Sequence, residues 1–251
     1  MSIFKYIKLS ISIFFIFILM TFIFISTQST SMNIRKNNTT INIPTFNLND
    51  NAVNYNKNDI STCTINRKEV LNKAYEMANV SWIPKYNLFD KYSHYTFIKG
   101  KTYYGIPYSM SYYQATSIND FLSKISNSNV IYGNDCAGFV SICWGINRQT
   151  TLSLFNAVKY HTKIDGKTVN EISWQDLKPG DALLLDNGGG KGHIMIYIDT
   201  NPKNGNELNV YEQNVQTVTP FVSVPTARKD VRFKSNLINS GYIPIRLMTL
   251  T

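Results

Sequence analysis

The distribution of hydrophobic and polar residues shows three patterns along the chain, and the first is a continuous apolar run near the N-terminus. It extends from about Leu9 to Ile25 and follows Lys5 and Lys8, which is the arrangement of an export signal. The run is about as long as the shortest membrane-spanning helices, and the small residues after it do not form a clear cleavage site. Residues 1–30 are therefore interpreted as either a cleaved signal peptide or a retained membrane anchor. We expect an exported protein, secreted or associated with the cell envelope.

The second pattern is polar and covers residues 31–63, where Asn, Thr and Ser dominate as in a flexible spacer. The third begins near residue 64, where apolar residues start to recur on one helical face: Val70, Leu71, Ala74, Met77 and Ala78. Thr64 or Asn66 can cap this helix, which begins near Arg67. We expect residues 64–251 to form one folded domain, since that length buries a sizeable single core.

Aromatic residues dominate the stretch that follows, WIPKYNLFDKYSHYTFIKGKTYYGIPYSM, residues 82–110. Gly105 and Pro107 indicate that its last part is extended and turning. Two interpretations stay open, namely the wall of a groove and loop packing.

The motif YGNDCAGFVSICWG, residues 132–145, places Cys136 at the start of an expected helix. Asn134 or Asp135 can cap that helix. Unpaired backbone N–H groups and the positive end of the helix dipole favour a thiolate at this position. Gly138 would let a backbone or a ligand approach the helix closely. Cys136 is therefore a candidate nucleophile, and a buried core cysteine is the alternative.

The other two cysteines are expected to be structural. Cys143 lies two helical turns after Cys136 among apolar residues, so we expect it to be buried. Cys63 stands at the edge of the spacer, and a Cys63–Cys143 disulfide stays open because it would leave Cys136 free.

Among the three histidines, His193 has the setting of a general base. The segment WQDLKPGDALLLDNGGGKGHIMIYIDT, residues 174–200, predicts a turn at 178–181, a strand at 182–185, a glycine loop at 188–192 and a second strand that begins with His193. A core histidine is the alternative interpretation. His94 and His161 show no comparable setting, and we expect both to be ordinary surface or packing residues.

A turn near residue 203 and the segment ELNVYEQNVQTV, residues 207–218, predict that the His193 strand pairs back as a hairpin. Pairing around that turn brings Glu212 or Asn214 across from His193. Because side chains alternate along a strand, these residues share a face with the histidine. Either one could orient the imidazole, although a solvent-facing polar edge would also explain them.

The formal net charge of +9 comes from cations spread along the chain rather than gathered in one block. Such a surface attracts an anionic wall polymer or membrane surface, and the attraction weakens with salt. Helix-turn-helix spacing, zinc-finger ligands and aromatic–basic sheet motifs are missing from the sequence, so no nucleic-acid partner is expected. We expect a monomer.

Four sequence features together resemble the papain-like cell-wall peptidases of the NlpC and CHAP types. Residues 135–140 (DCAGFV) look like their nucleophile helix, residues 177–181 (LKPGD) like their turn into the sheet, and Gly192-His193 like their general-base segment. Residues 212–214 (EQN) are similar to the CHAP ending. The resemblance covers roughly residue 67 to the C-terminus.

Two positions depart from the NlpC pattern. That type usually has Ser after the catalytic Cys, where this chain has Ala137. It also often uses a second His as the third catalytic member, where this chain offers Glu212 and Asn214.

The resemblance implies an α+β, papain-like fold, in which N-terminal helices, including the nucleophile helix, pack on a central antiparallel sheet. It also implies an exported peptidoglycan hydrolase, a thiol peptidase or amidase that cleaves an amide bond of the peptide stem or cross-link. Cys136 would attack the carbonyl, His193 would transfer the proton, and Glu212 or Asn214 would orient the ring. Further oxyanion or substrate contacts are expected from three residues: Tyr108, Tyr132 and Asp135.

No metal or organic cofactor is needed for this chemistry, and the substrate would be peptidoglycan or a wall peptide. Two other function classes stay open. One is a non-catalytic wall-binding module, and the other is an acyltransferase or transglutaminase on the same papain-like fold.

Overall fold

A computed structural model describes residues 65–111, 114–189, 191–215 and 224–251. The predicted signal or anchor, the predicted spacer and Cys63 lie outside these residues. Within the described ranges, no helix is both long and apolar enough to cross a membrane.

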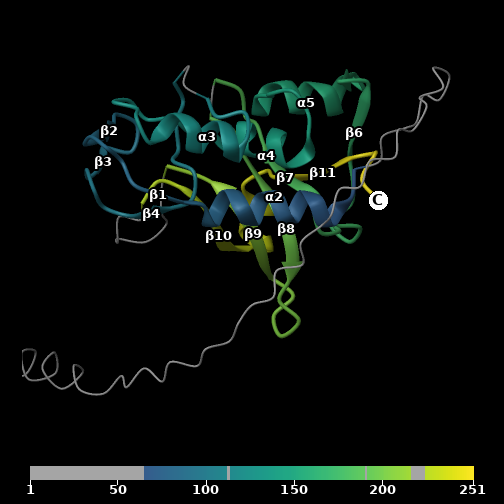
Figure 1. The fold of residues 1–251 in the computed structure, drawn as a ribbon. Coiled ribbons are helices and arrows are strands. Elements are labelled where there is room, and N and C mark those ends of the chain that lie inside the picture. Colours follow the sequence, from purple (N-terminus) through teal and green to yellow (C-terminus); the bar gives the residue numbers. More distant parts are fainter. Residues whose placement is uncertain (1–64, 112–113, 190, 216–223) are drawn as a thin grey trace, which may run out of the picture. The chain divides into compact units, whose positions relative to one another are not determined.

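A seven-stranded antiparallel sheet forms the centre of the described chain, and helices cover it (Figure 1). The helices are α2 (Arg67–Asn79), α3 (Ile118–Ile125), α4 (Cys136–Trp144), α5 (Thr151–Tyr160) and α6 (Lys234–Asn239). In the order in which they pair, the strands are β10 (Ala227–Phe233), β9 (Glu207–Gln213), β8 (His193–Thr200), β7 (Ala182–Leu185), β11 (Ile243–Leu247), β6 (Lys167–Glu171) and β5 (Lys163–Ile164). The α+β fold class predicted from the sequence is confirmed.

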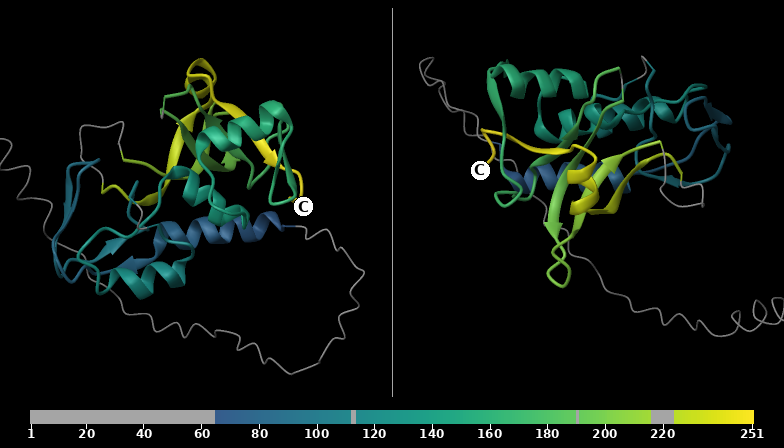
Figure 2. Two further views of the ribbon diagram at one scale, coloured as in Figure 1. Left: turned by 90° about the horizontal axis from the view of Figure 1, so that it is seen from above. Right: turned by 180° about the vertical axis from the view of Figure 1, so that it is seen from behind.

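The two faces of this sheet pack against different helices. Ile194 and Ile196 of β8 belong to the main core, which α2 and α4 share (Figures 1 and 2). Met195 of β8 and Val210 of β9 point to the other face, where Leu237 of α6 packs against them. Alternation along β8 therefore puts His193 on the face of Met195, as the sequence pattern predicted.

Helix α2 begins where the sequence predicted, and Asn66 is its N-cap, accepting a hydrogen bond from the Lys68 N–H at 2.8 Å. Arg67, its first residue, reaches Asp181 at 2.9 Å, and Arg246 of β11 reaches the same carboxylate at 2.7 Å. The Asp181 side chain has no exposed surface. The LKPGD turn is therefore an anchor for the sheet, because a buried carboxylate needs such partners.

The aromatic stretch forms two small sheets, which pair β1 (Ser81–Trp82) with β4 (Tyr103–Tyr104) and β2 (Leu88–Asp90) with β3 (Tyr95–Phe97). Trp82 is buried, with its ring centroid 5.1 Å from that of Phe97 and 5.3 Å from that of Tyr103. The loop-packing interpretation therefore holds for these rings. The segments 92–94 and 108–110 of the same stretch contribute to a pocket, which is described below.

The strand-like segment before α4 is pressed against residues 107–109. The Asn134 N–H donates to the Pro107 carbonyl at 3.1 Å, and the Ser109 N–H donates to the Asn134 carbonyl at 2.9 Å. A Cβ on Gly133 would lie 2.0 Å from the Pro107 oxygen. Only glycine fits this approach, which fixes Tyr108 beside the start of α4.

We expect Gly133→Ala to lower the free energy of unfolding by about 1 to 3 kcal/mol, because the added carbon must displace a backbone carbonyl. Gly205→Ala is the matched control: a Cβ at residue 205 would have no neighbouring atom within 4 Å, so it should change stability by no more than about 0.5 kcal/mol. Urea unfolding followed by circular dichroism measures both. Equal stabilities of the two variants would contradict the close approach.

Candidate active site

Cys136 is the first residue of α4 and is 8% exposed. Asp135 caps the helix by accepting a hydrogen bond from the Gly138 N–H at 2.7 Å. The first N–H groups of a helix have no partner within it, and they carry the positive end of its dipole. The structure therefore places the thiol in the electropositive setting that the sequence predicted.

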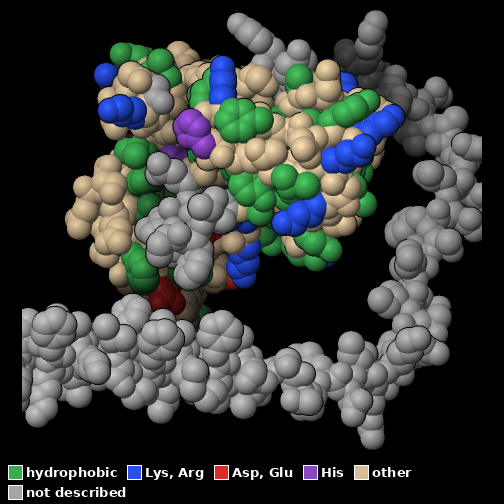
Figure 3. Space-filling view, turned by 90° about the vertical axis from the view of Figure 1, so that its left-hand side faces the viewer, with side chains coloured by type: hydrophobic (Ala, Val, Ile, Leu, Met, Phe, Trp, Pro, Cys, Tyr) green, Lys and Arg blue, Asp and Glu red, His purple; other side chains and the backbone are tan. Residues whose placement is uncertain are grey.

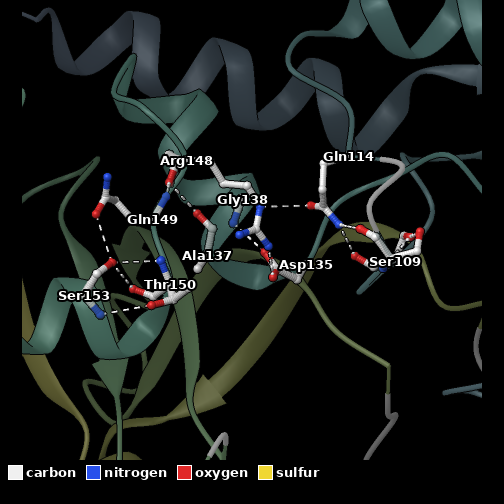
Figure 4. A network of polar contacts seen from close by, with 11 residues as sticks. Ser109, Gln114, Asp135, Ala137, Gly138, Arg148, Gln149, Thr150 and Ser153 are labelled. Carbon is white, nitrogen blue, oxygen red and sulfur yellow. Dashed lines mark hydrogen bonds and ion pairs between the residues drawn. The ribbon is translucent and has the colours of Figure 1, made fainter.

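A chain of polar side chains holds the segment before α4 in place (Figure 4). Arg148 pairs with Asp135 and donates from Nε to Gln114 Oε1 at 3.2 Å, and Gln114 Nε2 donates to the Ser109 carbonyl at 2.8 Å. A Cβ on Gly138 would lie 3.1 Å from the Asp135 carboxylate, so the cap occupies the space that the glycine leaves. The missing side chain of Gly138 therefore makes room for the helix cap.

These contacts give Asp135 a role different from the predicted oxyanion or substrate contact. Its carboxylate accepts the cap hydrogen bond and pairs with Arg148, so it is not a donor to an oxyanion. Burial raises the pKa of Asp135, although the Gly138 N–H and Arg148 act in the opposite direction. We interpret Asp135 as the residue that positions Cys136.

His193 begins β8 and stands between Cys136 and Glu212. Its Nε2 lies 3.0 Å from Glu212 Oε2, and an ionised carboxylate only accepts, so the ring nitrogen donates. Cys136 lies close enough to the imidazole to raise its pKa, and Nδ1 is the ring nitrogen that Glu212 leaves free. Burial lowers the pKa of His193, but Cys136 and Glu212 outweigh it and raise the pKa to about 9.

The register of β8 and β9 decides which polar residue meets the imidazole. Met195 pairs with Glu212, so Glu212 lies diagonally across from His193, and the same register continued by two residues puts Asn214, the other predicted candidate, opposite His193. Diagonal neighbours on one face are close enough for long side chains to touch. Asn214, which follows the last residue of β9, lines the pocket described below, and its carbonyl accepts a hydrogen bond from Arg228 at 3.3 Å.

Two arginines of β10 hold the other oxygen of Glu212. Arg228 and Arg232 donate from Nη2 to Glu212 Oε1 at 2.7 and 2.5 Å, and the Glu212 side chain is 0% exposed. Burial raises the pKa of Glu212, but His193, Arg232 and Arg228 outweigh it and lower the pKa to about 2. The carboxylate is therefore ionised over the whole physiological range.

A pocket of about 640 Å³ opens over Cys136 and His193. One wall comes from the turn between β2 and β3 and from the 108–110 segment, and the other comes from the glycine loop and the end of β9. Its described lining residues are Tyr92, Ser93, His94, Tyr108, Met110, Cys136, Lys191, Gly192, His193, Asn214, Val215 and Tyr242. The groove-wall interpretation therefore holds for part of the aromatic stretch, and His94, expected to be an ordinary residue, lines the pocket.

Tyr108 lines this pocket and is 7% exposed. Burial and the nearby charges of Cys136 and Asp135 raise its pKa far above the usual value. The phenol therefore stays protonated and can donate a hydrogen bond at every physiological pH. Together with the backbone N–H of Cys136, it can serve an anionic oxygen.

Tyr132 does not join this group. Its hydroxyl accepts a hydrogen bond from Lys124 Nζ of α3 at 2.5 Å, and Tyr132 is not among the residues lining the pocket. The sequence predicted it from proximity to Cys136 alone, and the extended backbone before the helix directs the side chain toward α3.

The remaining sulfur and imidazole groups are structural. Cys143 is a fully buried free thiol, and burial raises its pKa; Cys63, the other end of the bridge left open above, lies outside the described residues. His161 ends α5 with a left-handed backbone. Among the described residues, no group of three or more His, Cys, Asp or Glu side chains could hold a metal ion.

Two features of the site were not predicted from the sequence, the charged strand β10 and the buried amide of Gln213. Gln213 donates from Nε2 to the carbonyls of Ile106 and Pro107, at 2.9 and 2.6 Å, and so anchors the segment that carries Tyr108. The alternation of Arg228, Asp230 and Arg232 was the available signal for β10. Three charged residues on one strand face, with Phe233 and Ala227 on the other, indicate a polar face with buried partners.

We expect the His193 imidazole to titrate near pH 9 and to titrate at lower pH in Cys136→Ala or Glu212→Gln, because each change removes a group that raises its pKa. NMR of the ring protons measures this. Cys143→Ala should leave the titration unchanged. An unshifted titration in both of the first two variants would contradict the geometry.

Comparison with known proteins gives one family, NlpC/P60, whose family model matches residues 113–227. The match includes Cys136, His193 and Glu212 and supports cell-wall peptidase or hydrolase activity as the general class. No curated protein and no solved structure matched the chain. The resemblance of NlpC type is confirmed over residues 113–227, which match the NlpC/P60 family model.

Proposed function

We propose that this protein is an exported peptidoglycan hydrolase that cleaves an amide bond of the peptide stem or cross-link through Cys136. One observation carries the proposal: Cys136 and His193 line the same open pocket, Cys136 raises the pKa of His193, and His193 is hydrogen bonded to the buried Glu212. A protein that only bound the wall would have no use for this series. Export rests on the apolar N-terminal run alone.

In the proposed reaction, the Cys136 sulfur attacks the amide carbonyl carbon and forms a tetrahedral intermediate. His193 holds the thiol proton as an imidazolium and gives it to the leaving amine as the C–N bond breaks. A thioester remains on Cys136. Water then attacks the thioester carbonyl, with His193 as the base, and the acid product leaves with the free thiol restored.

Two donors support the oxygen that becomes negative. The backbone N–H of Cys136 points from the start of α4, and the Tyr108 hydroxyl lines the same pocket. Donors that are already in place lower the barrier more than donors that must reorganise. Gln213 and Gly133 hold the Tyr108 segment, so this arrangement rests on buried contacts.

The charges at the pocket favour an anionic substrate. Lys191 lines it, and its described lining includes no Asp or Glu. Elsewhere on this face, Lys and Arg side chains are dispersed, as Figure 3 shows. A stem peptide carries free carboxylates, so a positive pocket on a basic surface would attract it.

We expect Cys136→Ala to lose at least about 10³-fold of the wall-cleaving rate, since the nucleophile is gone. The assay incubates purified peptidoglycan with the protein, measures new free amines, and identifies the fragments by mass spectrometry. Cys143→Ala is the matched control because Cys143 lies in the core, and it should stay active if it folds.

Three outcomes would contradict this proposal. Full activity of Cys136→Ala would show that Cys136 is not the nucleophile. Wall binding by the wild-type protein without new amines favours a binding module. Products in which the acyl group has moved to an added amine rather than to water favour an acyltransferase.

We expect Glu212→Gln to lower kcat by about 10²-fold or more, because the imidazolium loses its anionic partner. Asn214→Ala should lower it by about tenfold or less, since Asn214 lies at the pocket and Glu212 makes the contact with the ring. His161→Ala is the control for a histidine outside the site and should keep the wild-type rate. Equal losses in Glu212→Gln and Asn214→Ala would show that the contact at Nε2 has no special weight.

A further inference from the structure

The Glu212 carboxylate is buried so completely that it needs cations beside it. Its side chain has no exposed surface, and those of Arg228 and Arg232 are only 18% and 14% exposed. One carboxylate oxygen faces the imidazole, and the other faces both guanidinium groups. The two sides of the carboxylate thus have separate partners.

The pairing of β9 and β10 produces this arrangement. Arg228 lies directly opposite Glu212, and Asp230 and Arg232 follow on the same face at alternate positions. Asp230 Oδ2 lies 3.2 Å from Arg232 Nη2 and 3.6 Å from Arg228 Nε, so it holds the two arginines together. Both arginines follow the segment that matches the family, which ends at residue 227.

Charge balance explains why two arginines are needed. During acyl transfer His193 loses its proton, and without other cations Glu212 would then be a buried carboxylate with no charged partner. A buried charge that loses its partner costs several kcal/mol, unless it takes up a proton instead. A protonated Glu212 would no longer favour the imidazolium.

We propose that Arg228 and Arg232 are positioning residues that keep Glu212 ionised and turned toward His193 in both protonation states of the histidine. The catalytic part of this inference rests on the proposed function, whereas the state of Glu212 does not. Neither arginine lines the pocket, so neither is expected to touch substrate. The low pKa of Glu212 agrees with this, since Arg232 and Arg228 both lower it.

Other charged groups face this cluster from each neighbouring element, and they enter any pH dependence. They are Cys136 from α4, His193 from β8, Asp230 from β10 and Tyr242 from the turn before β11. Burial raises the pKa of Tyr242 to about 12, against the effect of Arg232, so Tyr242 stays neutral below that pH. Cys136 and His193 exchange one proton between them, which leaves Glu212 as the group whose charge the arginines control.

The test compares Arg228→Gln and Arg232→Gln with Lys229→Gln, whose exposed side chain lies between them on the opposite strand face. Carbon-13 NMR of the Glu212 carboxyl measures its pKa, which should rise from about 2 by about one unit or more when a guanidinium is lost. Nitrogen-15 NMR above pH 9 should show the neutral His193 ring as the Nε2–H tautomer in the wild-type protein and as a mixture of the Nε2–H and Nδ1–H tautomers in the arginine variants. Lys229→Gln should match the wild type in both measurements.

The kinetic readout separates positioning from binding. We expect each arginine variant to lower kcat by about 10- to 100-fold with KM unchanged within about twofold, by analogy with groups that orient metal ligands. Arg232→Lys keeps the charge and should recover the low Glu212 pKa and most of kcat. If a glutamine variant does not fold, Arg232→Lys still allows the test.

Two results would overturn the inference. One is an unchanged Glu212 pKa and an unchanged His193 tautomer in variants that have only lost stability, which would make the arginines purely structural. The other is an Arg232→Lys protein as impaired as Arg232→Gln. If the wild-type protein cleaves no wall, both NMR measurements still decide the inference, and the rate of Cys136 alkylation by iodoacetamide replaces kcat.

Discussion

The hydrogen bond between His193 Nε2 and Glu212 Oε2 is the contact on which the rest of the site depends. It requires a carboxylate that is both buried and ionised, a combination that is costly unless the partners are already in place. The β8–β9 register brings the two side chains within reach, and β10 supplies the cations that keep the acid charged. The raised pKa of His193, and with it the imidazolium facing Cys136, follows from this one contact and the thiol beside it.

The second half of the site is held by backbone contacts and buried amides. Gly133 allows the segment before α4 to touch Pro107, and Gln213 ties the Pro107 carbonyl to β9. The same strand therefore carries Glu212 on one face and the anchor for Tyr108 on the other. Rigid elements position reactive groups more accurately than loops do, and here one strand positions both the proposed partner of the base and the segment of the proposed oxyanion donor.

The sequence was sufficient for the features that depend on local pattern. The α4 cap, the strand at Ala182–Leu185 and the start of β8 at His193 follow from turn residues and side-chain alternation, and all three are present. It was insufficient where tertiary placement decides. Tyr132 was chosen for proximity in sequence yet points to Lys124, and His94 was set aside yet lines the pocket, because only the packed β2–β3 turn brings it there. The sequence left the β8–β9 register uncertain by a single residue pair, and this register decides that Glu212 lies diagonally across from His193.

Some parts of the site lie outside residues 113–227, the segment that matches the family, and come from the chain before and after it. Tyr92, His94 and Tyr108 precede residue 113 and form a pocket wall, while Arg228 and Arg232 follow residue 227 and fix the charge of Glu212. Cys136, His193 and Glu212 lie between them, within the segment that matches the family. In the proposed reaction, chemistry and its adjustment are therefore encoded in different stretches of the chain: substitutions in the wall would change what enters the pocket without altering the proton transfer, whereas a change in β10 would alter the proton transfer without touching the substrate.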